Sequence, residues 1–81
     1  NPLQDVAALR FTMPAAGRVR LAVFGAFGNR LDKVDLGWIG EGEQQVTWHR
    51  PAEMAGGICF FRLEMENGGL VAMGKAIVLP K

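Results

Sequence analysis

The last third of the chain holds two long strand-like segments joined by the sequence Asn67-Gly68-Gly69. In residues 58–66, one face carries Cys59, Phe61, Leu63 and Met65, and the other carries Phe60, Arg62, Glu64 and Glu66. Residues 70–79 form a second, almost wholly apolar segment. Successive side chains of a strand point to opposite faces, and asparagine and glycine accept the positive φ angles of a tight turn. This stretch therefore predicts a β-hairpin.

The same period of two recurs upstream and predicts strands at residues 5–13, 18–26, 30–36 and 43–49. Residues 37–42, where Trp38 lies between glycines, and residues 52–57 are predicted loops. No window has the period of 3.6 residues that a helix needs. About six or seven short strands predict an all-β fold, an antiparallel β-sandwich. A chain of 81 residues forms a single domain, residues 1–81.

The residue types that are missing restrict the chemistry of the chain. Serine and tyrosine are absent, and there is one histidine, His49, and one cysteine, Cys59. A serine triad is therefore excluded, and one chain cannot supply a cysteine and histidine metal quartet. Cys59 with His49 is the remaining nucleophilic pair. Because Cys59 alternates with large apolar residues, we expect it to be a small buried hydrophobic residue.

Two pairs of neighbouring carboxylates are the other catalytic candidates, Asp32 with Asp35 and Glu41 with Glu43. Glycosidases place two carboxylates on either side of a scissile bond. A domain this small has little room for the required cleft. We therefore expect no enzyme activity, no cofactor and no metal.

The charge pattern argues against two classes of partner. The net charge is +1, and acidic and basic residues are interspersed. A nucleic-acid-binding protein usually carries a basic surface, so we expect no nucleic-acid partner. No apolar run approaches the length of about 18 residues that a membrane span needs, so the chain is not expected to cross a membrane. The start at Asn1-Pro2, without a signal peptide, favours a fragment or excised domain of a larger protein.

Several segments, taken in order and spacing, carry a family resemblance: residues 1–2, 9–14, 19–24, 28–31, 42–48, 57–63 and 74–81. Together they resemble the C-terminal sorting domain of the type IX (Por) secretion system, which occurs on secreted proteins of Bacteroidetes. They are also similar to the Ig-like domain of the flagellar hook-assembly protein. The resemblance covers essentially the whole chain.

The resemblance implies an Ig-like sandwich of seven strands that directs the secretion or surface attachment of a larger protein, such as a hydrolase. The family's glycine–hydrophobic–tyrosine motif corresponds to Gly57, Ile58 and Cys59, with cysteine in place of tyrosine. Its lysines correspond to Lys75 and Lys81. The implied partners are outer-membrane secretion and attachment machinery and lipopolysaccharide, and the implied location is extracellular or on the bacterial surface.

One physical argument supports this interpretation, and two alternative functions compete with it. A terminal strand that pairs within a sheet holds Lys75 at a fixed position for a receptor. One alternative is a module that binds polysaccharide with Trp38 as an aromatic platform. The sequence leaves exposure and burial of Trp38 equally open, whereas Trp48 alternates with Val46 and is expected in the core. The other alternative is a structural domain of the flagellar hook cap.

Overall fold

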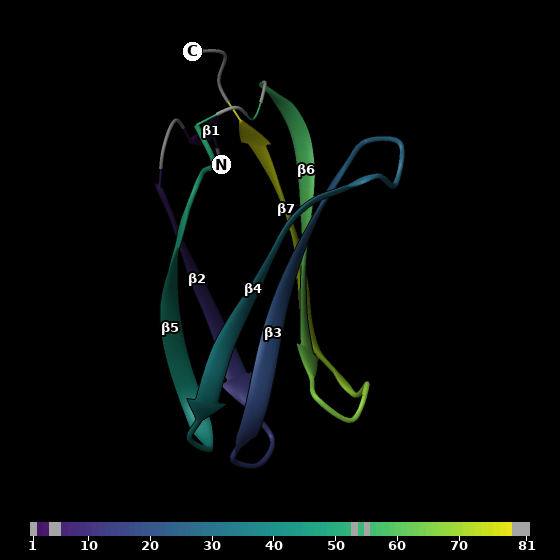
Figure 1. Cartoon of the computed structure of the whole chain (residues 1–81). Coiled ribbons are helices and arrows are strands. Elements are labelled where there is room, and N and C mark those ends of the chain that lie inside the picture. The colour runs from purple at the N-terminus through teal and green to yellow at the C-terminus, as the bar shows by residue number, and fades with distance from the viewer. Residues whose placement is uncertain (1, 4–5, 53, 55, 79–81) are drawn as a thin grey trace.

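The structure, a computed structural model, describes residues 2–3, 6–52, 54 and 56–78. Its strands are β1 (Pro2–Leu3), β2 (Val6–Met13), β3 (Gly17–Gly25), β4 (Arg30–Ile39), β5 (Gly42–His49), β6 (Gly57–Met65) and β7 (Leu70–Val78). One sheet has the order β1-β7-β6-β3-β4, and the other consists of β2 and β5 (Figure 1).

This arrangement confirms the predicted all-β class and its two sheets. Six strands have eight to ten residues, and β1 adds a short strand of two, which agrees with the predicted six or seven strands. One detail of the prediction is wrong: the sheets are not wholly antiparallel, because β1 runs parallel to β7.

The core lies between the two sheets and is built from the alternate positions that the sequence indicates. The larger sheet contributes Val19, Leu21, Val23, Cys59, Phe61 and Leu63, and the smaller sheet contributes Phe11, Met13 and Trp48. Burial of each large apolar side chain stabilises the fold by about 1.5–3 kcal/mol relative to exposure. The predicted inward faces of β2, β3, β5 and β6 are confirmed.

Trp48 connects the two sheets at the centre of this core. It is 2% exposed, as predicted for a core residue. Its ring meets Phe61 of β6 edge to face, with centroids 5.2 Å apart and planes at 76°. Its Nε1–H donates a hydrogen bond of 2.8 Å to Asp32 Oδ2 on β4. The buried indole therefore has both apolar contacts and a partner for its one polar group.

The predicted loop at residues 37–42 is wrong at both ends, because residues 37–39 belong to β4 and Gly42 begins β5. The pairing of β3 with β4 skips Leu31 and Leu36, so each is the extra residue of a β-bulge. After the second bulge Gly37 has a φ of 74°, which favours glycine. Each bulge reverses which positions of β4 face inward. The alternation in the sequence therefore predicted a strand that ends at residue 36, three residues before β4 ends.

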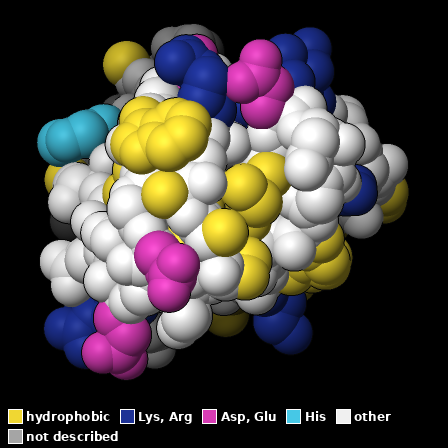
Figure 2. Space-filling model, turned by 90° about the horizontal axis from the view of Figure 1, so that it is seen from below, with side chains coloured by type: hydrophobic (Ala, Val, Ile, Leu, Met, Phe, Trp, Pro, Cys, Tyr) yellow, Lys and Arg dark blue, Asp and Glu magenta, His cyan; other side chains and the backbone are white. Residues whose placement is uncertain are grey.

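Turns and connections lie at opposite ends of the sandwich. The lower end in Figure 1 carries the β2–β3, β4–β5 and β6–β7 turns, and the upper end carries the β3–β4 turn and the connection from β5 to β6. Figure 2 views the lower end, where hydrophobic side chains reach the surface among both acidic and basic ones. This end therefore has no charge field of a single sign. Residues 57–59, which carry part of the family resemblance, lie at the upper end.

Candidate functional site

The first residues of β6 and the second half of β7 bring most of the predicted recognition residues together. Gly57, Ile58 and Cys59 pair with residues 78, 77 and 76 of β7. Lys75 follows in the same register, opposite Phe60. Lys81 lies outside the described residues. The recognition residues that the structure describes therefore form one corner of the larger sheet.

These residues differ in what they present to solvent. Gly57 has a φ of 142°, a backbone conformation that side chains with a Cβ rarely adopt. Ile58 and Lys75 are exposed. Cys59 is 0% exposed, which confirms its expected burial. A partner can therefore contact Ile58 and Lys75 directly, whereas Cys59 acts through packing.

Burial also decides the chemistry of Cys59. Desolvation raises the pKa of the thiol, and the nearby Arg50 charge opposes this effect without overcoming it. Cys59 is thus in its protonated, unreactive thiol form at neutral pH. The partner considered in the sequence, His49, points to the solvent side of β5, while Cys59 points into the core. The structure does not bring this pair together.

We expect Cys59 to resist thiol reagents while the protein is folded. Labelling with a chromogenic disulfide in native buffer should be on the order of a hundredfold slower than in denaturant, because reaction requires opening of the core. The measurement is the labelling rate with and without urea. Equal rates in the two conditions would show that the thiol is accessible.

The side chains of β6 and β7 that point away from the core form a largely apolar surface. Register places Ile58 beside Ile77, Phe60 beside Lys75 and Arg62 beside Met73. We call Ile58, Phe60, Met73, Lys75 and Ile77 the outer patch. Its four apolar members are 38–69% exposed. Outward positions of a sandwich strand are usually polar, and contiguous exposed apolar surface marks an interaction site.

An open pocket of about 500 Å³ adjoins the outer patch at the upper end of the sandwich. Its walls come from the β3–β4 turn, the start of β4, the residues before β6 and the start of β6, and include Phe27, Arg30, Met54, Gly57 and Ile58. Phe27 is almost fully exposed at its rim. Because Ile58 belongs to both the pocket and the patch, the two form one continuous surface.

Arg50 donates hydrogen bonds to the backbone of Met54, which lines this pocket, and the sequence pattern did not indicate Arg50 as a site residue. It is 7% exposed, and its Nε and Nη2 atoms donate hydrogen bonds of 3.2 Å and 2.7 Å to the Met54 carbonyl oxygen. The available signal was the alternation of β5, because Arg50 shares the inward parity of Trp48. An inward arginine anchors the connection that leads into β6.

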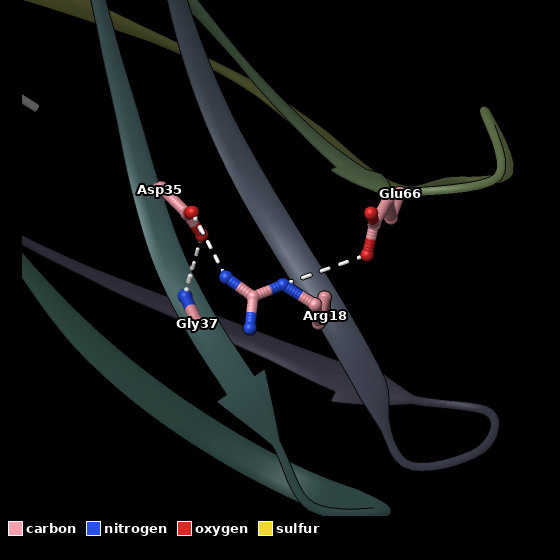
Figure 3. A network of polar contacts seen from close by, with 4 residues as sticks. All are labelled: Arg18, Asp35, Gly37 and Glu66. Atoms are coloured by element: carbon pink, nitrogen blue, oxygen red, sulfur yellow. Dashed lines mark hydrogen bonds and ion pairs between the residues drawn. The ribbon is translucent and has the colours of Figure 1, made fainter.

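A second polar network lies near the lower end (Figure 3). Arg18 of β3 bridges Asp35 of β4, at 3.0 Å, and Glu66 of the β6–β7 turn, at 3.5 Å. The backbone N–H of Glu66 donates to the Arg18 carbonyl oxygen at 3.0 Å. Asp35 Oδ1 also accepts a 2.9 Å hydrogen bond from the Gly37 N–H. This network fixes the bulge of β4 and the β6–β7 turn to β3.

One of the two candidate carboxylate pairs, Asp32 with Asp35, is separated by this arrangement. Asp35 is on the outer face of β4, whereas Asp32 is partly buried and accepts the Trp48 hydrogen bond. The hydrogen bond from Gly37, and then that from Arg18, lower the pKa of Asp35. The two carboxylates therefore have structural partners and do not face a common cleft.

We expect the carboxyl group of Asp35 to titrate below its ordinary value of about 3.9. A lowered pKa means that the folded state favours the carboxylate. Its contribution to stability is therefore complete above the unfolded pKa and is lost as the pH falls through the folded pKa. The titration midpoint in NMR spectra measures the shift. Arg18→Gln should raise that midpoint only partly, because the Gly37 hydrogen bond is the larger cause.

Trp38 lies next to the last residue of β4 on the outer face, opposite Arg18, and is 68% exposed. Trp48, the other indole, is buried. The exposed surface thus offers a single tryptophan rather than a platform of two.

Within residues 2–3, 6–52, 54 and 56–78, no group of three or more histidine, cysteine, aspartate or glutamate side chains is placed to bind a metal ion. The same residues include no helix with the length and hydrophobicity needed to cross a bilayer. Comparison of the chain with protein-family models, with curated proteins and with solved structures found no match.

Proposed function

We propose that this chain is a non-catalytic Ig-like module that directs type IX secretion or cell-surface attachment of a larger protein. The observation that carries the proposal is the outer patch. Ile58 and Lys75, two residues of the family resemblance, lie in this exposed and mainly apolar surface, on neighbouring strands. The two hydrogen-bonded strands hold the side chains of Ile58 and Lys75 in fixed positions, which suits a signal that a receptor must recognise.

The strand order supports the Ig-like part of the proposal. In Ig domains, strands B and E lie in one sheet and strands C, F and G in the other, with strand C′ beside C in variable domains. Here β2 and β5 correspond to B and E, while β4-β3-β6-β7 corresponds to C′-C-F-G. Sheet order is set by pairing between strands far apart in sequence, whereas the resemblance rests on local sequence segments.

The patch also indicates what its receptor should look like. Four apolar side chains surround the Lys75 position, and Arg62 lies beside Met73 on the same face. A complementary surface would be apolar with an acidic group placed to meet a lysine. Apolar contact supplies affinity, and a charge at a fixed position supplies specificity and register.

Export of a reporter tests the proposal. Residues 1–81 fused to the C-terminus of a periplasmic reporter, in a host with the type IX system, should carry the reporter to the cell surface or the medium. Retention of the folded fusion in the periplasm would contradict the proposal. Ile58→Asp and Lys75→Ala with Lys81→Ala should each reduce export several-fold. Lys33→Ala, an exposed lysine of β4 outside the patch, is the matched control and should leave export unchanged.

The exposure of Trp38 favours a second candidate, a polysaccharide-binding module. An exposed indole can stack on a sugar ring. Affinity electrophoresis in gels containing polysaccharide distinguishes the two functions, because the sorting proposal expects no retardation. Retardation that is lost in Trp38→Ala would support carbohydrate binding.

A further inference from the structure

The outer edge of β7 is only partly paired. Within the described residues, β7 contacts β6 along one side, and on the other side it pairs with β1 only at Ile77 and Val78. Residues 70–76 have no neighbouring strand on that side in this part of the chain. An edge strand presents backbone N–H and C=O groups that can pair with another strand. This free edge continues directly from the part that β1 occupies.

The sandwich is also open beneath this edge. Gly74 pairs with Phe61 and so faces the core side of the sheet, yet it is exposed, and a Cβ at this position would meet no atom of the described residues within 4 Å. Ala72, on the same side, is only partly buried. From the other sheet, Ala7 and Leu9 of β2 point inward but are also only partly buried. The side of the core between β2 and β7 is therefore incompletely covered.

We propose that this open side accepts an extended segment of a partner protein as an additional strand beside residues 70–76 of β7. The segment would run parallel to β7, in line with β1, and would place apolar side chains at alternate positions over Gly74 and Leu9. Backbone pairing provides affinity, and the space at Gly74 selects a large inward side chain.

The occupant is a partner segment rather than a second copy of this chain. Two copies joined through β7 would oppose Ala72 and Gly74 to the same open space, because these two residues pair with the inward residues Leu63 and Phe61. Small side chains would leave the space unfilled. This inference goes beyond the sorting function, since it concerns the edge of the sheet and not the outer patch, and it stands whether or not the module directs secretion.

A strand supplied in the same chain tests the inference without a known partner. A segment of about eight residues that alternates valine and threonine, joined before Asn1, would continue β1 along the free edge of β7. We expect amide hydrogen exchange at residues 70–76 to slow by on the order of tenfold relative to the unfused chain. A segment with the same composition but the valines in one block should not slow exchange. Equal protection by both segments, or by neither, would overturn the inference.

Two further measurements define the space and the occupant. Gly74→Leu should occupy the open side and remove the protection that the alternating segment confers, whereas Gly40→Leu, the matched control at the β4–β5 turn, should leave it intact. Protection that persists in Gly74→Leu would contradict the role of the open space. Dimerisation of the unfused chain, with exchange at residues 70–76 slowing as concentration rises, would assign the edge to a second copy and overturn the inference.

Discussion

Replacement of Trp48 by alanine is expected to lower the free energy of unfolding by about 3–5 kcal/mol. The substitution leaves a cavity between the sheets, removes the edge-to-face contact with Phe61 and removes the hydrogen bond that Trp48 donates to Asp32 Oδ2. A domain of this size has a total stability of about 4–12 kcal/mol, at roughly 0.05–0.15 kcal/mol per residue. The variant should therefore be only marginally folded at 37 °C.

Urea denaturation followed by circular dichroism measures this effect. Trp38→Ala is the matched control, because it removes the same side chain from an exposed position and should change stability by no more than about 0.5 kcal/mol. Trp48→Phe separates the two contributions: it keeps an aromatic ring in the core but removes the N–H donor, and we expect an intermediate loss. Similar losses in Trp48→Ala and Trp38→Ala would contradict the central position of Trp48.

Replacement of Arg50 by alanine is expected to cost about 2–3 kcal/mol, the second largest effect. Hydrogen bonds to a charged group contribute about 1.5–3 kcal/mol, and the buried stem of the arginine adds apolar contact. The loss of Arg50 leaves the Met54 carbonyl oxygen without its two donated hydrogen bonds. The connection that enters β6 should therefore become more mobile, and with it the pocket beside Ile58.

Urea denaturation measures the stability loss, and limited proteolysis of residues 51–57 measures the local effect. Arg62→Ala is the control, because its side chain is about half exposed and pairs with Glu64 at 3.4 Å on the surface. An exposed pair of this kind contributes about 0–1 kcal/mol. Arg50→Lys should recover part of the stability, since it keeps the charge but has one ammonium in place of a guanidinium. If Arg50→Ala and Arg62→Ala cost the same, Arg50 does not anchor the connection.

The alternation of the sequence predicted the faces of most strands correctly. Val19, Leu21 and Val23 in β3 face the core, and so do Cys59, Phe61 and Leu63 in β6. These positions follow from a local property, because side chains alternate in any extended strand whatever its neighbours. The hairpin around Asn67-Gly68-Gly69 was predictable for the same reason, since turn residues act through their own backbone preferences.

The sequence pattern failed where pairing departs from regularity. At the two bulges of β4, Leu31 and Leu36, the inward and outward positions exchange. The alternation of apolar residues therefore predicted an end of the strand before Trp38. A bulge is defined by the opposite strand, which local periodicity does not contain. Arg50 is a different case: its parity indicated an inward position, but a charged side chain is not expected there, and its hydrogen bonds to the Met54 carbonyl are made only by the folded chain.

The candidate site divides in the same way. The family resemblance selected Gly57, Ile58, Cys59, Lys75 and Lys81, but it did not distinguish a side chain that a partner can touch from one that is buried. Alternation within the strand already predicted the burial of Cys59, and register adds that Ile58 and Lys75 share the outer face. The open side at Gly74 was not visible in the sequence, because it depends on how far β1 extends along β7.

The sequence by itself determined that the chain is all-β, which residues turn inward along most strands, and which catalytic groups are missing. Tertiary structure alone decided the order of strands in the two sheets, the separation of Asp32 from Asp35, the anchoring role of Arg50, and the free edge of β7. The physical reason is the distance along the sequence over which each effect acts. Alternation and turn preference act between neighbours in the chain, whereas register, bulges and exposed edges arise from pairing between residues far apart in sequence.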